Sequence, residues 1–192
     1  MPQRIPLNTP DQHSGHARLF FALWPDEALR DAIYKASRGV VVTSGGRAVA
    51  RENLHITLAF LGGISDAAAE QAAAAADEVL EGTFSFELDE FGFWPTSQVL
   101  WYGCSTPPAM TRSLALKLRE RLQARSLRPD TNKFVPHVTL ARWVHKAGPF
   151  MPATRIPWLV NEFTLIRSET HTSGVEYTPL ARWPLGRQGV LI

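Results

Sequence analysis

The sequence predicts an α+β protein with two pseudo-symmetric lobes around a central groove. Strand-like segments outnumber helical ones and do not alternate with them regularly, unlike the segments of a parallel βαβ fold. Two strand-like segments, NLHITLAFLG (53–62) and FVPHVTLARW (134–143), repeat one pattern at a separation of roughly eighty residues. This repeat indicates an internal duplication. Because no Pro/Gly/Ser-rich linker divides the chain, we expect both lobes to lie in one domain spanning 17–192.

The composition is that of a globular protein in a reducing compartment. The chain has 192 residues, of which 45% are hydrophobic and 20% are charged. No apolar run approaches the roughly 18 residues that a membrane span needs, and the polar N-terminus does not resemble a secretory signal. A single cysteine, Cys104, cannot form an internal disulfide. We therefore expect a cytoplasmic protein without membrane contact, with a flexible tail over residues 1–16.

The N-terminal elements follow from an apolar run and the signals around it. RLFFALW (18–24) predicts a strand. Pro25 suits the first position of a helix, two acidic residues follow it, and Gly39 is expected to end that helix. The stretch 40–51 is ambiguous, and the first motif strand comes after it.

The remaining elements are predicted from caps, breakers and alternation. Gly62-Gly63 should end the first motif strand, and Ser65 should cap an alanine-rich helix that runs to Glu81. Leucines at four-residue spacing predict another helix between Pro108 and Arg128. Further strands are predicted at 84–93, 99–104, 134–143, 158–167 and 175–183.

The two repeated segments place a histidine and a threonine on one face of each strand. His55 and Thr57 are two residues apart, and so are His137 and Thr139. Strand side chains alternate between faces, so each His–Thr pair must share a face. The sequence thus presents two imidazole-plus-hydroxyl pairs from distant parts of the chain.

Two imidazoles across a cleft suit acid–base chemistry on phosphorus. One histidine can act as a base while the other acts as an acid, with the attacking and leaving oxygens in line. The threonine hydroxyls can donate hydrogen bonds to phosphate oxygens. Two histidines and two threonines supply only two good metal ligands, fewer than zinc normally takes, so we expect neither a metal nor another cofactor.

The segment from Arg112 to Arg128 contains six basic residues and one acid, Glu120. It is either a solvated helix face or a track for phosphate groups.

The motif segments resemble those of a known family. HITL (His55–Leu58) and HVTL (His137–Leu140) are similar to the signature motifs of two-histidine phosphoesterases. RLFFALWPDE, FTLIRSETHTSGVEYTPLARWPL and the motif contexts resemble bacterial RNA 2′,3′-cyclic phosphodiesterases, also known as 2′-5′ RNA ligases. The resemblance implies mostly antiparallel sheets with outer helices, and metal-independent opening of an RNA-terminal 2′,3′-cyclic phosphate to a 2′-phosphomonoester.

The resemblance also implies roles for the motif residues, although the residues alone leave the division between acid and base open. His55 would donate a proton to the departing O3′, and His137 would activate water. Thr57 and Thr139 would hold the phosphate oxygens. The partners would be RNA ends or nucleotides with a 2′,3′-cyclic phosphate, and we expect a monomer.

Three further residues are candidate substrate contacts. Arg142 falls where the family has an arginine that contacts phosphate or nucleotide, yet it lies five residues after His137 and so on the opposite face of a regular strand. A bulge or a strand end at Ala141 would restore its direction. Phe20 or Phe21 either stacks a terminal base or packs in the core.

Two other functions remain open from the sequence. The same histidines would serve 2′-5′ RNA ligation, in which a 5′-hydroxyl end replaces water. A non-catalytic nucleotide- or RNA-binding module is the other alternative, although both motifs are intact.

Overall fold

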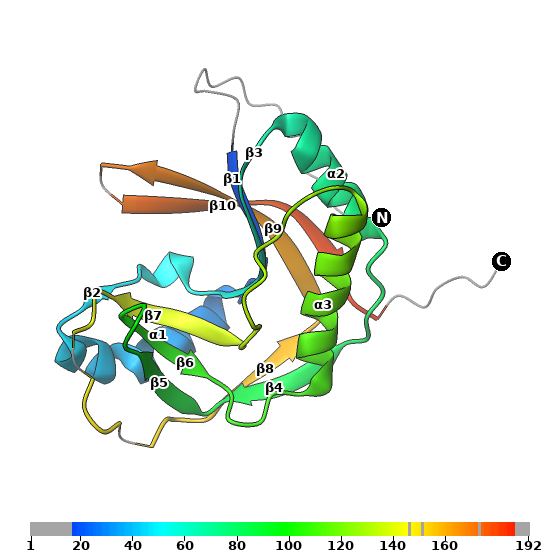
Figure 1. Ribbon diagram of the computed structural model, residues 1–192. Helices are drawn as coiled ribbons and strands as arrows, with labels where there is room; N and C mark the ends of the chain where they lie inside the picture. The colour runs from blue at the N-terminus through cyan, green and yellow to red at the C-terminus, as the bar shows by residue number, and fades with distance from the viewer. Residues whose placement is uncertain (1–16, 146, 151, 173, 187–192) are drawn as a thin grey trace.

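The computed structural model describes residues 17–145, 147–150, 152–172 and 174–186 (Figure 1). The predicted tail over residues 1–16 lies outside this part of the chain. The described residues form three α-helices: α1 (Glu27–Ser44), α2 (Asp66–Asp77) and α3 (Ala109–Ala124). They also form a short 3-10 helix, η1 (Arg51–Asn53), and the strands β1 (Ala17–Leu23), β2 (Arg47–Ala48), β3 (Ile56–Ile64), β4 (Phe84–Leu88), β5 (Glu90–Trp94), β6 (Val99–Gly103), β7 (His137–Arg142), β8 (Ile156–Val160), β9 (Glu162–His171) and β10 (Gly174–Pro184).

The main sheet consists of two halves that meet at the motif strands. Its order is β10-β9-β1-β3-β7-β6-β5, with β2 paired to β7, and every pairing is antiparallel. Within each half the strands share long registers, but β3 and β7 pair only through Ile56 and Val138. The two halves therefore splay apart from a single residue pair (Figure 1). The antiparallel sheets together with the three helices confirm the predicted α+β class.

The helices cover the outer side of the sheet. Helix α1 contacts β6, β7 and β8, while α3 packs on β3 and α2 packs on β10 and α3. In α2 the buried side chains are all alanines, so this helix can approach its neighbours closely. None of the helices in the described ranges is long and apolar enough to cross a membrane.

Helix α1 is longer than predicted. It begins after Asp26, whose carboxylate caps it by accepting a hydrogen bond from the Leu29 N–H. It continues past Gly39 to Ser44 and ends at Gly45, which adopts the left-handed conformation with φ of 64°. The helix continues past Gly39 because Val40 and Val41 pack against the core, and Gly45 supplies the positive φ that favours a stop. Helix α2 ends at Asp77 and not at Glu81.

Two predicted strands are each two strands, because the chain changes sheets within them. Residues 84–93 divide at Asp89 into β4, which pairs with β8, and β5, which pairs with β6. The Asp89 carboxylate accepts hydrogen bonds from the Ser105 N–H and hydroxyl, which anchors this turn. Similarly, residues 158–167 divide at Asn161 into β8 and β9. Gly62-Gly63 does not end the first motif strand, which continues to Ile64 through a bulge.

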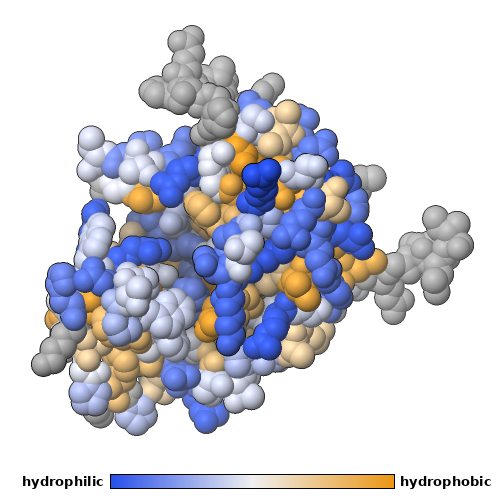
Figure 2. Space-filling model, in the orientation of Figure 1, coloured by the Kyte–Doolittle hydropathy of each residue, from blue (hydrophilic) through white to orange (hydrophobic). Residues whose placement is uncertain are grey.

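The basic segment on α3 is engaged in ion pairs. Lys117 binds Glu81 at 3.1 Å, and Arg119 binds Asp130 at 3.3 Å. Two further arginines, Arg121 and Arg125, lie against Glu78. Figure 2 shows a hydrophilic surface over this helix. Because four of the six basic residues are paired with carboxylates, the arrangement favours a solvated helix face over a phosphate track.

Candidate active site

The two motifs meet where the halves of the sheet join. Ile56 and Val138, the middle residues of each His-x-Thr, are the paired residues of β3 and β7. Because the strands are antiparallel, each histidine lies across from the threonine of the other motif. A proton on His137 would lower the pKa of His55 by charge repulsion, so both imidazoles belong to one site.

Both histidines are oriented by backbone carbonyls two residues before them. His55 Nδ1 lies 2.7 Å from the Asn53 carbonyl oxygen, and His137 Nδ1 lies 2.7 Å from that of Val135. A carbonyl only accepts, so each Nδ1 carries the proton and each Nε2 is left to exchange one. His55 Nε2 lies 3.0 Å from the Thr57 hydroxyl, which confirms that this His–Thr pair shares a face.

Aromatic side chains surround His55 and lower its pKa. The rings of Phe20, Trp24 and Tyr177 have centroids 4.8, 5.7 and 5.3 Å from the imidazole. Burial is the largest cause that lowers the pKa of His55 to about 4, although the hydrogen bond to Asn53 opposes it. The charges of His137 and Arg142 lower this pKa further.

His137 lies in a similar but less enclosed position. The ring of Trp94 contacts it edge-on, with centroids 4.5 Å apart. Burial is the largest cause that lowers the pKa of His137, and the charge of Arg142 acts in the same direction. Both imidazoles are therefore neutral at pH 7 in the ligand-free protein.

A β-bulge turns Arg142 toward the histidine side of β7. Leu100 pairs with Ala141 and Trp101 pairs with Thr139, so Leu140 is an extra residue on β7. Leu140 and Ala141 are both buried, and Arg142 is exposed. The bulge breaks the strict alternation of the strand, so a side chain five residues after His137 can share its face. Arg142 also acts electrostatically on both histidines.

The first motif has a bulge at the equivalent position. Phe21 pairs with Ala59 and Ala22 pairs with Thr57, so Leu58 is the extra residue on β3. Leu58 and Ala59 are both buried, and Phe60 is exposed. The repeated Leu-Ala of the two motifs thus coincides with a repeated irregularity, and Phe60 occupies the place that Arg142 has in the second motif.

The structure separates Phe20 from Phe21. Phe21 is 0% exposed and packs against Phe163 and Trp183 on the opposite face, so the prediction that it could stack a base is wrong. Phe20 does lie on the histidine side, but it is only 3% exposed and packs against His55 and Tyr177. Phe20 therefore packs against one face of the His55 imidazole.

Sequence reasoning did not single out several of the residues that enclose the histidines. Trp24 lies four residues after Phe20 in one run, so shared strand parity was a usable signal. Tyr177 and Trp94 come from β10 and β5, and nothing local connects them to the motifs. Asn53 was not predicted as a site residue either. Its carbonyl orients His55, and its side-chain amide donates to the Val175 carbonyl at 2.7 Å.

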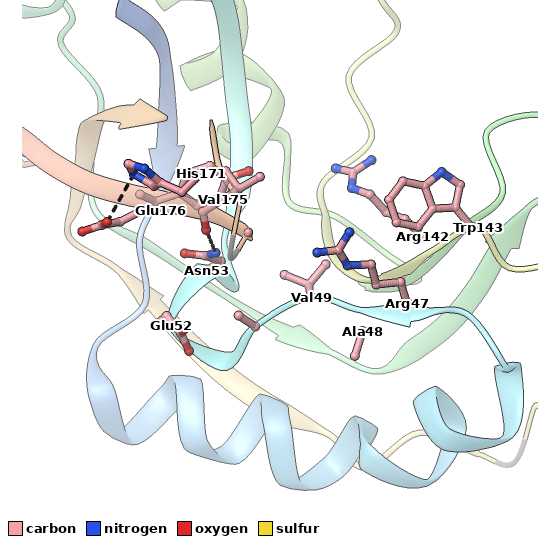
Figure 3. Close-up of a pocket in the computed structure, with 13 residues that line it drawn as sticks. Arg47, Ala48, Val49, Glu52, Asn53, Arg142, Trp143, His171, Val175 and Glu176 are labelled. Carbon is pink, nitrogen blue, oxygen red and sulfur yellow. Dashed lines mark hydrogen bonds and ion pairs between the residues drawn. The ribbon is translucent and has the colours of Figure 1, made fainter. Parts of the chain in front are cut away.

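A cavity of about 610 Å³ lies between β2, the end of β7 and the β9–β10 hairpin. Figure 2 shows the surface hollowed in this region. In Figure 3 the guanidinium groups of Arg47 and Arg142 lie on one side of it, near Trp143, and His171 and Glu176 lie on the other. Asn53 and Tyr177 line it and also contact His55, so the cavity adjoins His55.

The donor groups at this site suit proton transfer. Throughout the ranges that the structure describes, no three His, Cys, Asp or Glu side chains gather as the ligands of a metal ion would. Burial raises the pKa of the Cys104 thiol, so it is not an activated nucleophile. Two imidazoles, two hydroxyls and an arginine are the groups that acid–base catalysis at a phosphate ester would need.

Comparison with known proteins gives the family. Residues 23–101 match the model of the LigT like Phosphoesterase family. The chain is 34% identical to the RNA 2′,3′-cyclic phosphodiesterase of Escherichia coli (strain K12), over 88% of this chain and 96% of that protein. It is 32% identical to the RNA 2′,3′-cyclic phosphodiesterase of Thermus thermophilus, over 88% of this chain and 90% of that one. The chain therefore belongs to the LigT-like phosphoesterases, which are two-histidine phosphoesterases.

A solved structure agrees with this assignment. The crystal structure of E. coli LigT complexed with 3′-AMP superposes with a TM-score of 0.83 at 34% identity, covering 90% of this chain and 99% of that one. The expected resemblance to RNA 2′,3′-cyclic phosphodiesterases is confirmed.

Proposed function

We propose that this protein hydrolyses the 2′,3′-cyclic phosphate at an RNA end to a 2′-phosphomonoester. The observation that carries the proposal is the pair of Nδ1-anchored imidazoles on β3 and β7, which meet at Ile56–Val138 with their Nε2 atoms unused by the backbone. The relatives named as RNA 2′,3′-cyclic phosphodiesterases support the substrate class, and the E. coli complex with 3′-AMP supports a nucleotide in such a site.

In the proposed reaction the two histidines act on opposite sides of phosphorus. His137 Nε2 accepts a proton from water as the water oxygen bonds to phosphorus. The bond from phosphorus to O3′ breaks, and protonated His55 Nε2 donates its proton to O3′. The phosphate remains on O2′, and the next cycle needs only a proton exchange between the two imidazoles through solvent. No metal is needed for these transfers.

The threonines and Arg142 would bind the phosphate itself. The hydroxyls of Thr57 and Thr139 can donate hydrogen bonds to its non-bridging oxygens, and the β-branched side chains hold those hydroxyls firmly. The Thr57 hydroxyl donates to His55 Nε2 in the ligand-free protein. It would turn to the phosphate once His55 is protonated. Arg142 would offset the negative charge of the phosphate.

The lowered pKa of His55 gives substrate binding a role in the mechanism. His55 is neutral at pH 7 without ligand, so its function as an acid requires a proton that burial disfavours. A phosphate anion between the imidazoles favours the protonated form. We infer that the substrate itself raises the pKa of His55 enough for it to act as the acid.

Turnover of a cyclic-phosphate oligonucleotide tests the proposal. His55→Ala and His137→Ala should each lower kcat by about 10²–10⁴-fold, and EDTA should have no effect. His145→Ala is the matched control, because that imidazole hydrogen-bonds Gln98 and takes no part in the reaction. Near-normal turnover by either motif variant, or a 3′-phosphate product, would disprove the mechanism.

Three further expectations belong to this proposal. The protein should act as a monomer and in the cytoplasm. Given a paired RNA with a 5′-hydroxyl end, it should form little joined product, because water outcompetes a dilute hydroxyl group. Dominant joining in that assay would favour the 2′-5′ ligase alternative.

A further inference from the structure

One wall of the cavity is an arginine–tryptophan pair that the mechanism does not use. Strand β2 pairs with the end of β7, so that Arg47 is the cross-strand neighbour of Arg142. The Arg47 guanidinium lies 5.4 Å from the centre of the Trp143 ring. Trp143 is 56% exposed and lines the cavity.

The backbone around Trp143 is specialised to hold it there. Trp143 has a φ of 55°, a conformation that bulky residues rarely adopt. The next residue, Val144, is fully buried and donates its N–H to the Gln98 carbonyl at 3.1 Å. A Cβ at Gly46 would lie 2.4 Å from Val144 Cγ2, so only glycine lets β2 approach this closely. These features together fix Arg47 and Trp143 at the mouth of the cavity.

The two arginines on this wall are not neutralised by a carboxylate within the described part of the chain. Neither Arg47 nor Arg142 forms an ion pair or a side-chain hydrogen bond there, whereas Arg119 and Arg182, for example, do. Across the cavity the Glu176 carboxylate lies 3.5 Å from His171 (Figure 3). Glu52 also lines the cavity, on the side of η1. Two guanidinium groups therefore line the cavity without an ion pair to either carboxylate.

We propose that this cavity binds the penultimate nucleotide of the RNA substrate, with its base stacked on Trp143 and the linking phosphodiester at Arg47. The proposal rests on the proposed function. Arg142 acts electrostatically on both histidines, so it lies nearer the reacting phosphate, and Arg47 adds a second positive charge one strand farther out. A cyclic mononucleotide carries a single phosphate and would leave Arg47 unused.

The size and chemistry of the cavity fit this occupant. Its volume of about 610 Å³ lies within the usual range of ligand sites, roughly 300–1,000 Å³. Exposed aromatic rings with arginine beside them are the common platform for unpaired bases. The substrate class that follows is an RNA end of at least two nucleotides.

The first motif offers a matched pair for comparison. Arg18 lies 5.9 Å from the centre of the Phe60 ring, and Phe60 stands at the position equivalent to Arg142. Phe60 is 37% exposed, and neither residue lines the cavity. This second arginine–aromatic pair is the control for a general effect of removing a charge or a ring.

The test compares a 2′,3′-cyclic mononucleotide with a dinucleotide that ends in a 2′,3′-cyclic phosphate. Trp143→Ala should lower kcat/KM for the dinucleotide about tenfold or more and leave the mononucleotide within about twofold. Trp143→Phe should keep most of the dinucleotide activity. Arg47→Gln should also act only on the dinucleotide, and should reduce the salt dependence of its kcat/KM by about one phosphate contact.

Arg18→Gln and Phe60→Ala should have the wild-type kcat/KM for both substrates. Equal losses on both substrates with Trp143→Ala, or a dinucleotide-specific loss only with the Arg18 and Phe60 variants, would overturn the proposal. If the wild type turns over neither substrate, the proposed function fails. Calorimetric binding of the dinucleotide with a 2′-phosphate end then decides the site separately: weaker binding by Trp143→Ala supports it, and unchanged binding overturns it.

Discussion

Acidification should weaken the folded protein through His55. The imidazole is enclosed by Phe20, Trp24 and Tyr177, and its pKa is lowered from 6.5 to about 4. In the unfolded chain the same group binds a proton near pH 6.5. Between these two values the unfolded state holds more protons than the folded state, so the free energy of unfolding must fall as the pH falls.

The size of the effect follows from the separation of the two pKa values. Each pKa unit corresponds to 1.36 kcal/mol, so a drop from 6.5 to about 4 corresponds to about 3 kcal/mol. This loss should begin below about pH 6.5 and be nearly complete near pH 4. His137, whose pKa is also lowered, should add to it in the same direction.

Urea unfolding of the wild type and of His55→Asn over this pH range measures the contribution. The difference in unfolding free energy between the two proteins should change by about 3 kcal/mol from neutral pH to pH 4. Thr57→Val is the matched control, since it removes the hydroxyl beside Nε2 but no titrating group, and should keep the wild-type pH dependence. A constant difference, or an NMR titration midpoint for His55 at or above 6.5, would refute the reasoning.

Two further predictions concern charge and packing near the site. Arg142→Gln should raise the pKa of both motif histidines, because the charge of Arg142 lowers both values. The variant should therefore move the bell-shaped pH profile of kcat/KM to higher pH and reduce its height. An unshifted profile would show that the charge of Arg142 does not act on the histidines. Gly92→Ala should destabilise the protein by about 1–3 kcal/mol, because its Cβ would lie 2.0 Å from the Trp101 ring. Gly39→Ala, in the middle of α1 with nothing within 4 Å, should stabilise it by about 0.5–1 kcal/mol. Thermal unfolding of both glycine variants checks the contrast, and equal effects would contradict it.

The sequence alone predicted that His55 and Thr57 share one face, because strand side chains alternate. The same alternation puts Phe20 and Phe21 on opposite faces, yet both residues were expected as candidates for stacking a base. Which face borders the histidines is a property of the assembled sheet, and the sequence could not decide it. The surrounding rings of Tyr177 and Trp94 come from strands that reach the site only through tertiary pairing.

The bulges and the points where the chain changes sheets could not be predicted from local sequence patterns, because they depend on tertiary pairing. The register of β7 against β6 leaves Leu140 without a paired residue on β6, and the residue type of Leu140 does not indicate a bulge. Asp89 and Asn161 each divide an alternating run, because the chain leaves one sheet for another there. Hydrogen-bond partners far along the chain decide where a strand bulges or changes sheets. The alternation of apolar and polar residues in the sequence therefore continues across these positions without a break.

The extra residue in each motif strand has a consequence for how the duplicated halves can diverge. In a regular strand the residue five positions after each histidine would lie on the opposite face from it. The bulge changes this in both copies, and the position holds an aromatic ring, Phe60, in one copy and a cation, Arg142, in the other. The two His-x-Thr motifs can thus stay alike while the residues beside them differ. Such a difference is required of a site that must distinguish the 5′ side of an RNA substrate from its 3′ side.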